Sequence, residues 1–272
     1  MLKQRIITAI ILLVLLAVVL LSGSNFIVMS TLAVFFAAAV WESLQLFAIR
    51  RALVLSLFSV PLLFWVLTTQ TPVDIFNVAV ICVLIWAMRF FPALKFGLPT
   101  TDGARGNLFT LVFLLTLLGC FISIHALYQR SVLFLISAMA IVWIADIGAY
   151  FVGRAIGKRK LAPTISPGKS WEGALGGWLF VMLIGATTVF TPLFVDSFTA
   201  QLQKNLGWPL WILCMTVIVA ASIVGDLFES LLKRRAGVKD SSKLLPGHGG
   251  VLDRIDALIP VMPLVVLMSV GL

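Results

Sequence analysis

The sequence predicts an all-α integral membrane protein that crosses the bilayer several times. Of its 272 residues, 61% are apolar and only 11% are charged, and the mean hydropathy is +1.12. No soluble core could bury that much apolar surface, so the bilayer acts as the solvent. The apolar residues also gather in runs close to the length that a helix needs to cross a membrane. Together these observations exclude a soluble globular protein.

Nine apolar runs predict nine transmembrane helices. The first run follows Lys3 and Arg5, as in a secretory signal peptide, but no small-residue cleavage site is clear after it and a second long run begins at once. We therefore expect an uncleaved first helix. The nine runs cover residues 6–21, 26–46, 53–68, 75–88, 108–126, 132–152, 174–194, 208–232 and 257–272.

The basic residues predict a cytoplasmic N-terminus. With that orientation only Arg130 and Lys204 of the 20 Lys and Arg residues fall on the far side, which is a strong positive-inside signal. Because the charge of +9 is spread over short loops between apolar runs, it indicates the inner leaflet rather than nucleic acid. The 18 cytoplasmic residues are Lys3, Arg5, Arg50, Arg51, Arg89, Lys95, Arg105, Arg154, Lys158, Arg159, Lys160, Lys169, Lys233, Arg234, Arg235, Lys239, Lys243 and Arg254.

The chain divides into a scaffold half and a polar half. Residues 1–130 hold almost no ionisable side chain inside an apolar run; Glu42 and His125 are the exceptions, each near the end of its run, and we expect them to serve packing. Residues 131–272 form the expected catalytic half, with cytoplasmic loops at 153–173 and 233–256. The three cysteines lie singly in apolar runs, so neither a disulfide nor a zinc site is expected.

The most polar stretch, residues 230–256, predicts a metal and phosphate site at the membrane surface. Fixed positive charge suits an anionic ligand, and carboxylates among it suit a hard cation such as Mg²⁺. Glycine-rich backbone allows phosphate oxygens to approach closely. The stretch contains Lys233, Arg234, Arg235, Lys239, Lys243, Arg254, Asp240, Asp253, Asp256 and His248.

Two apolar runs carry polar stripes at helical spacing. Asp146, Tyr150 and Arg154 share one face of the sixth run. In the eighth run another stripe leads directly into the polar stretch, with Glu229 beside it; it comprises Ser222, Asp226, Ser230 and Lys233. Acids inside a membrane are costly and rarely face lipid. For Asp226 we favour a functional role over a purely structural ion pair that orients helices.

The loop at 153–173 is basic, contains two prolines and runs into a helix start. Ser166, Lys169 and Ser170 precede that start, which makes a phosphate cradle plausible. The cluster at 158–160 is equally well explained as an anchor to anionic lipid headgroups. Three later glycines are better explained by close helix packing than by chemistry; they are Gly173, Gly176 and Gly177.

The polar half contains a long motif: Ser230-x-x-Lys233-Arg234, then Lys239-Asp240, Leu245-Pro246-Gly247-His248-Gly249-Gly250 and Asp253-Arg254-x-Asp256. A second motif lies upstream: Ser166-Pro167-Gly168-Lys169-Ser170-Trp171-Glu172-Gly173. With these motifs the chain resembles the phosphatidate cytidylyltransferases, the CDP-diacylglycerol synthases of bacterial type, in which threonine is common at the position of Ser170. About the last 130 residues match well, whereas the first half agrees only as apolar spans.

The resemblance implies that CTP reacts with phosphatidic acid to give CDP-diacylglycerol and pyrophosphate, with one or two Mg²⁺ ions. It implies Asp226 and Asp253 as main metal ligands, with Asp256 and then Asp240 in support. It also implies that cations and a hydrogen-bonding histidine hold the phosphates, and that hydroxyls and glycines line the nucleotide site. The first group is Lys169, Lys233, Arg234, Lys239, Arg254 and His248; the second is Ser166, Ser170, Gly247, Gly249 and Gly250.

The implied setting is the bacterial inner membrane, with the site at its cytoplasmic face, where CTP arrives from water. The expected partners are CTP, phosphatidic acid and the bilayer, with no nucleic acid; a monomer and a homodimer are both compatible with the sequence. Three alternatives stay open: CTP-dependent chemistry on another lipid, including a lipid kinase; a transporter or channel, because membrane acids often mark ion pathways; and a structural scaffold.

Overall fold

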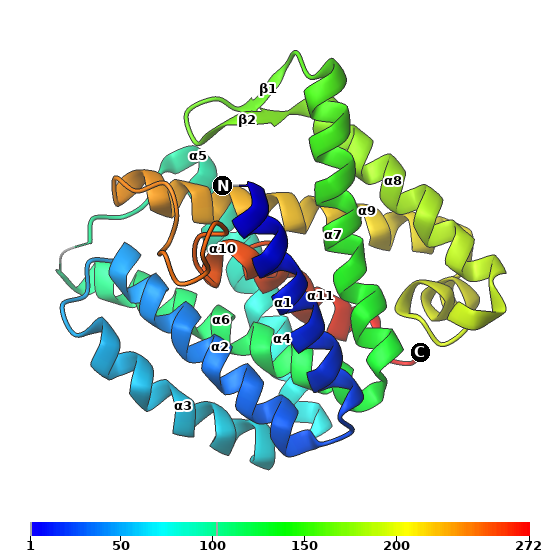
Figure 1. The fold of residues 1–272 in the computed structure, drawn as a ribbon, viewed down its shortest axis with the longest axis horizontal. Coiled ribbons are helices and arrows are strands. Elements are labelled where there is room, and N and C mark those ends of the chain that lie inside the picture. The colour runs from blue at the N-terminus through cyan, green and yellow to red at the C-terminus, as the bar shows by residue number, and fades with distance from the viewer. Residues whose placement is uncertain (1, 102) are drawn as a thin grey trace.

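A computed structural model describes residues 2–101 and 103–272, and it is a bundle of apolar helices (Figure 1). Seven described helices are long and apolar enough to cross a membrane. They are α2 (Asn25–Leu46), α3 (Ala52–Thr69), the segment Pro72–Phe96, α6 (Gly103–Arg130), α7 (Val132–Ile156), α8 (Trp171–Phe190) and α9 (Phe198–Arg235). The all-α membrane class predicted from sequence is therefore confirmed. The structure does not describe the side chains of residues 1–6, so the positions of the Lys3 and Arg5 charges stay a prediction.

Two of the nine expected spans correspond to other helices. The first is α1 (Leu2–Leu21), and the last is α11 (Leu258–Met268), which has only 11 residues. The segment Pro72–Phe96 is also longer than the expected 75–88 and consists of α4 (Pro72–Ile85), a π-helical turn η1 (Trp86–Phe90) and α5 (Phe91–Phe96). Pro92 lacks the N–H that a regular α-helix needs there, which accounts for the irregular turn just before it.

The short helix α11 forms the centre of the bundle (Figure 1). It packs against α4, α6, α7 and α9, and eight of its residues are buried, from Leu258 to Val266. A helix that is apolar all round belongs inside a bundle rather than at a lipid-facing surface. Because α10 (Leu252–Ile255) immediately precedes α11, this buried helix anchors the end of the polar stretch.

One end of the bundle gathers the segments that carry most of the basic residues. The Thr8 hydroxyl at the start of α1 donates to the Pro246 carbonyl oxygen at 2.9 Å. At the end of α9, Arg235 donates to the carbonyl oxygen of Pro99 at 3.2 Å and lies over the Phe47 ring. The N-terminal helix, the loop around residue 99 and the polar stretch therefore meet at the same end of the molecule.

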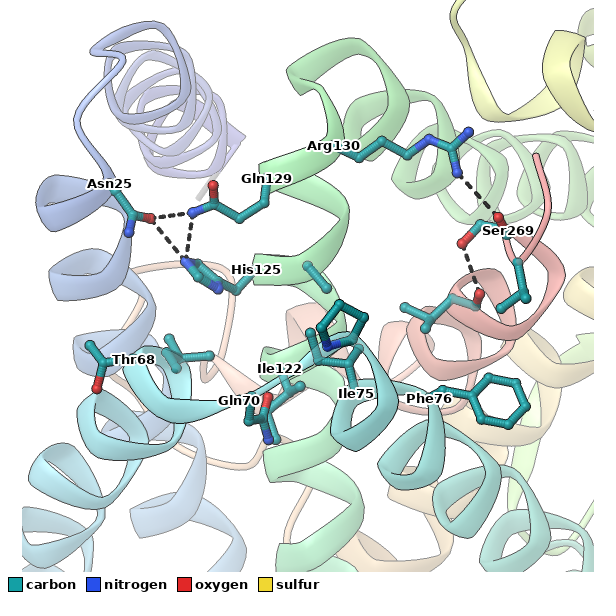
Figure 2. A pocket seen from close by; sticks show the side chains of 15 residues that line it. Asn25, Thr68, Gln70, Ile75, Phe76, Ile122, His125, Gln129, Arg130 and Ser269 are labelled. Atoms are coloured by element: carbon teal, nitrogen blue, oxygen red, sulfur yellow. Dashed lines mark hydrogen bonds between the residues drawn. The ribbon is translucent and has the colours of Figure 1, made fainter.

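The opposite end is closed by a separate set of polar contacts around a pocket of about 710 Å³ (Figure 2). The His125 ring contacts the Asn25 side-chain oxygen at 2.9 Å, and Gln129 donates to the same oxygen at 2.6 Å. Arg130 donates to the carbonyl oxygen of Leu272 at 2.8 Å. His125 is thus hydrogen-bonded within this set, and the C-terminus lies at the end opposite the polar stretch.

Helix α9 reaches the site after a kink near its start. Gly207 has φ of +72°, a conformation that side-chain-bearing residues avoid, and Pro209 follows it. The predicted span at 208–232 begins at this kink, where non-helical backbone at Gly207 separates it from a shorter helical segment that starts at Phe198. Its straight part then carries the Asp226 stripe toward the polar end of the bundle.

The loop between α7 and α8 contains a small hairpin that the sequence analysis did not predict. Strands β1 (Lys160–Ala162) and β2 (Ser166–Ser170) pair antiparallel. The Glu172 carboxylate accepts the backbone N–H groups of Lys158 and Arg159, which fixes the entry to the hairpin. Ser170 ends the hairpin and caps α8, its hydroxyl accepting the Gly173 N–H at 3.1 Å.

Helices α7 and α8 touch backbone to backbone through glycines. A Cβ atom at Gly173 would lie 2.9 Å from the Ala149 carbonyl oxygen, and one at Gly177 would collide with the Ala145 carbonyl oxygen. At Gly176 it would overlap the Val152 side chain. The prediction that these three glycines serve close helix packing is confirmed.

Replacing Gly177 by valine is expected to separate α7 from α8. Overpacking of this kind typically costs about 1–3 kcal/mol, so thermal unfolding in detergent should begin at a lower temperature than in the wild type. Gly168→Ala is the matched control, because a Cβ there meets no atom within 4 Å. Equal midpoints for the two variants would contradict the close-packing assignment.

Candidate active site

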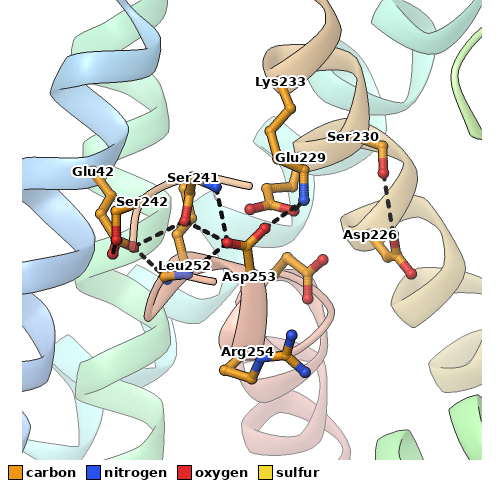
Figure 3. A network of polar contacts seen from close by, with 12 residues as sticks. Glu42, Asp226, Glu229, Ser230, Lys233, Ser241, Ser242, Leu252, Asp253 and Arg254 are labelled. Atoms are coloured by element: carbon orange, nitrogen blue, oxygen red, sulfur yellow. Dashed lines mark hydrogen bonds and ion pairs between the residues drawn. The ribbon is translucent and has the colours of Figure 1, made fainter. Parts of the chain in front are cut away.

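The site is built around Lys233, in the last turn of α9 (Figure 3). Its ammonium group contacts the Glu229 carboxylate one turn earlier and Asp253 Oδ1 at 2.6 Å. All three side chains are largely shielded from solvent, with 14%, 2% and 6% of their surfaces exposed. Charges this buried must be paired, so Lys233 ties the polar stretch to α9.

The second oxygen of Asp253 organises the loop that precedes it. Oδ2 accepts the N–H groups of Ser241 at 2.8 Å and Gly250 at 2.7 Å, and also the Ser241 hydroxyl at 2.8 Å. Burial opposes ionisation, but the hydrogen bonds from Lys233, Gly250 and Ser241 outweigh it and lower the pKa of Asp253 below its ordinary value. Asp253 is therefore an ionised carboxylate at neutral pH.

The glycine-rich turn is held by internal hydrogen bonds. Gly247 and Gly249 have φ of +78° and +80°, which favour glycine. The His248 N–H donates to the Leu245 carbonyl oxygen at 2.8 Å, and Arg254 donates to the His248 carbonyl oxygen at 2.7 and 3.1 Å. Since the amides of His248 and Gly250 already have protein acceptors, the turn is less open to phosphate than the sequence suggested.

A second acid and base pair lies beside the first. Asp226 Oδ2 is 2.5 Å from the Lys169 ammonium nitrogen, so the hairpin strand β2 is joined to α9 across the loop. The Ser230 hydroxyl lies 3.4 Å from Asp226 Oδ1 on the same helix face, as the stripe predicted. Both charged side chains keep more than a quarter of their surface exposed. They are therefore accessible from solution.

Asp256 connects the two pairs electrostatically. Burial, reinforced by the negative charge of Asp226, raises the pKa of Asp256 well above its ordinary value, while Lys233 and Lys169 act in the opposite direction. The Asp256 carbonyl oxygen also packs against α9 at Gly225, the residue before Asp226, so Asp256 lies close to the Asp226 pair. The three aspartates named as metal ligands are thus brought into one region.

These aspartates are oxygen donors of the kind that Mg²⁺ prefers. Within residues 2–101 and 103–272, however, no three His, Cys, Asp or Glu side chains converge closely enough to form a ready ligand set. Asp226 and Asp253 instead face Lys169 and Lys233. Carboxylate oxygens are suitable ligands for a magnesium ion. In this structure a lysine lies beside each of these two carboxylates.

The remaining predicted residues surround this centre. Arg234 donates to the Ile165 carbonyl oxygen at 3.2 Å, which fastens the hairpin to α9. Ser166 is half-buried on β2, and Ser170 is buried as the cap of α8. Lys239 and Asp240 lie exposed on the loop after α9. That these residues contact the nucleotide or a metal ion stays a prediction.

A cavity of about 510 Å³ leads from the charged cluster into the apolar bundle. Its polar end includes Asp146, His248, Asp253, Arg254 and Asp256. Its apolar walls come from α1, α2, α6 and α7, and include Leu12, Leu16, Phe35, Phe121 and Trp143. The cavity therefore joins charged groups to a hydrocarbon-like lining, which suits an amphipathic ligand.

Two acids in this region were not among the predicted site residues. Glu229 shares Lys233 with Asp253, and its spacing of four residues from Lys233 is a visible signal in the sequence. Glu42 of α2 is fully buried and accepts hydrogen bonds from the polar loop, including the Leu252 N–H at 2.6 Å. The expectation that Glu42 belongs only to scaffold packing is therefore wrong, because its partners lie in the loop of the site.

Replacing Lys233 by methionine is expected to leave two buried acids without their shared counter-charge. Breaking a buried pair in this way typically costs about 3–5 kcal/mol, so thermal unfolding in detergent should shift markedly downward. Lys239→Met, at an exposed lysine, is the control and should unfold like the wild type. Adding Glu229→Gln to Lys233→Met should recover part of the lost thermal stability, because one of the two unpaired charges is removed. If Lys233→Met unfolds at the same temperature as Lys239→Met, the stabilising role given to Lys233 is refuted.

Comparison with known proteins covers nearly the whole chain. The model of the "Cytidylyltransferase family" matches residues 3–270. A phosphatidate cytidylyltransferase of Haemophilus influenzae is 33% identical over 285 residues, 97% of this chain and 96% of that protein. One from Helicobacter pylori is 32% identical over 94% of this chain and 88% of its own length, and one from Pseudomonas aeruginosa is 51% identical over 47% of this chain and 44% of its own. The chain therefore belongs to the cytidylyltransferase family.

Proposed function

We propose that this membrane protein transfers the cytidylyl group of CTP to phosphatidate, giving CDP-diacylglycerol and pyrophosphate for phospholipid synthesis. A phosphate oxygen of the lipid attacks the α-phosphorus of CTP, a new P–O bond forms, and the bond to the β-phosphate oxygen breaks. No general base is required, because phosphatidate is already ionised at neutral pH. The difficulty is electrostatic, since two anions must be brought together.

The observation that carries this proposal is one cavity with a charged end and an apolar lining. Its polar end holds His248, Arg254 and three aspartates, and its walls are rich in leucine. Such a cavity matches a lipid whose phosphate is the reacting group, because the head needs cations and the tail needs hydrocarbon contacts. The family membership and the relatives named phosphatidate cytidylyltransferase support the same chemistry.

The basic side chains of the site fall into three groups: those that face an aspartate, one that lines the cavity, and those that are exposed to water. Lys169 and Lys233 each lie against an aspartate, so both ammonium groups are held in place before substrate arrives. Arg254 lines the cavity and suits a two-point grip on a phosphate. Arg234 and Lys239 are more exposed and extend the positive surface toward water, from which the triphosphate comes. His248 lines the same cavity, where its ring can donate a hydrogen bond to a phosphate oxygen.

Magnesium dependence is part of the proposal. Asp226 and Asp253 would hold the ion, with Asp256 as the third oxygen donor. When bound, Mg²⁺ would neutralise the triphosphate and the departing pyrophosphate. Lys169 and Lys233, as the present neighbours of Asp226 and Asp253, would then be available to the phosphates.

The proposed location is a bacterial inner membrane, with the site at the cytoplasmic face. Support comes from the bacterial relatives and from the concentration of basic loops at the end of the bundle that carries the site. At this face CTP arrives from water, while the lipid keeps its tails in the bilayer.

Purified full-length protein in lipid nanodiscs should release pyrophosphate from CTP only when phosphatidate and Mg²⁺ are both present. Asp226→Asn and Asp253→Asn should each lower turnover by about 100-fold or more, because a lost electrostatic contact in such a site is expensive. Asp196→Asn, at the far end of α9, is the control. Near-normal turnover in either site variant would remove that residue from the proposed site; release of CDP instead of pyrophosphate would indicate a lipid kinase.

Removing divalent metal should abolish the reaction without unfolding the protein. EDTA should stop pyrophosphate release, and added Mg²⁺ should restore it fully, because the oxygen donors bind a hard cation reversibly. Titration with sodium chloride controls for ionic strength, and titration with Ca²⁺ tests a divalent ion that is larger than Mg²⁺. Undiminished turnover in excess EDTA would contradict the metal assignment.

A further inference from the structure

Glu42 lies in the scaffold half of the chain but is bound to the loop of the site. It is fully buried near the C-terminal end of α2. Its Oε1 atom accepts the Ser242 hydroxyl at 2.5 Å and the Val251 N–H at 3.0 Å. Its Oε2 atom accepts the Leu252 N–H at 2.6 Å and the Ser241 hydroxyl at 3.2 Å. One carboxylate therefore ties together both ends of the segment 241–252.

The contacts of Glu42 favour a side chain with two acceptor oxygens at this position. Every partner of Glu42 is an N–H or O–H donor, and within the described residues no Lys, Arg or His nitrogen lies within 4.0 Å of it. A carboxylate can accept from all four donors. A glutamine would turn its NH₂ group toward one of the two backbone amides, so that amide would lose its acceptor and face another donor, whereas the neighbouring serine hydroxyl can rotate and accept.

The backbone makes room for this contact at one residue. A Cβ atom at Gly250 would overlap both the Ser241 hydroxyl and the Glu42 carboxylate. The Gly250 N–H at the same time donates to Asp253 Oδ2 at 2.7 Å. Gly250 is thus needed for the close approach of the loop to Glu42 and for the orientation of Asp253.

The contact reaches the charged centre through Ser241. Its hydroxyl lies between Glu42 Oε2 at 3.2 Å and Asp253 Oδ2 at 2.8 Å (Figure 3). Asp253 then presents its other oxygen to Lys233 of α9 at 2.6 Å. Glu42 on one side and Lys233 on the other hold the loop between α2 and α9.

We propose that Glu42 is a positioning residue, which holds segment 241–252 so that Asp253 and Arg254 face the charged end of the cavity. Its effect on turnover rests on the function proposed above, whereas its effect on the loop does not. Glu42 itself touches neither substrate nor reacting atom. Its loss should therefore lower kcat more than it raises the KM for CTP.

Glu42→Gln is expected to lower kcat by about 10- to 100-fold, the range usual for residues that orient a site from behind. Hydrogen exchange measured by mass spectrometry should become faster in peptides spanning residues 241–252, because one of the two amides, that of Val251 or that of Leu252, loses its acceptor. Peptides from α7 and α8 should exchange as in the wild type. Ser43→Ala is the matched control: Ser43 is equally buried on the same helix, but its hydroxyl donates within α2, to the Ala39 carbonyl oxygen.

A second variant keeps the test decisive if Glu42→Gln does not fold. Ser242→Ala removes one donor to Glu42 without touching Asp253, so it should speed exchange in the same peptides and lower kcat to a smaller extent. Wild-type kcat in Glu42→Gln, or lost activity with unchanged exchange in segment 241–252, would overturn the proposal. If the wild type itself makes no CDP-diacylglycerol, the proposed function fails, and the exchange result still decides whether Glu42 holds the loop.

Discussion

The Lys233 ammonium group, shared by Glu229 and Asp253, is the interaction on which the site depends. An acid buried near a membrane needs a counter-charge or a full set of donors, and the Lys233 ammonium group lies against both acids. The same pair joins the end of α9 to the start of α10, which leads into the buried helix α11. The polar stretch is therefore fastened both to a helix at the rim and to the centre of the bundle.

The other acids of the site obey the same requirement by different means. Asp226 faces Lys169 from the hairpin, and Glu42 is satisfied by four neutral donors of the loop. Helices α2 and α9, far apart in sequence, thus both hold the loop, and β2 is fastened to α9 beside it. The scaffold half of the chain contributes to the site as well as to the anchor, so a division at residue 130 does not separate structure from catalysis.

Much of this arrangement can be predicted from local patterns. Apolar runs locate the long helices, four-residue spacing places Ser230 beside Asp226, and clustered glycines mark the contact between α7 and α8. The resemblance of residues 230–256 to a known motif indicates the reaction class. These features depend on neighbours within a few turns or on a signature that is contiguous in sequence.

The remaining features depend on tertiary contacts that no spacing encodes. Glu42 and its loop donors lie about 200 residues apart, so nothing near Glu42 distinguishes it from a packing residue. The pairing of Lys169 with Asp226 requires the hairpin, whose strands of three and five residues are too short to predict from alternation. The short central helix α11 is apolar on every side, so composition alone cannot separate it from a spanning helix.

The central claim is that the acids and lysines around Asp226, Asp253, Lys169 and Lys233 form one nucleotide site. An experimental structure of the full-length protein with Mg²⁺ and a non-hydrolysable CTP analogue tests it most directly. The account predicts the triphosphate beside Lys169 and Lys233, with the metal ion on Asp226 and Asp253. A nucleotide bound elsewhere, with both acid and lysine pairs intact, would contradict it.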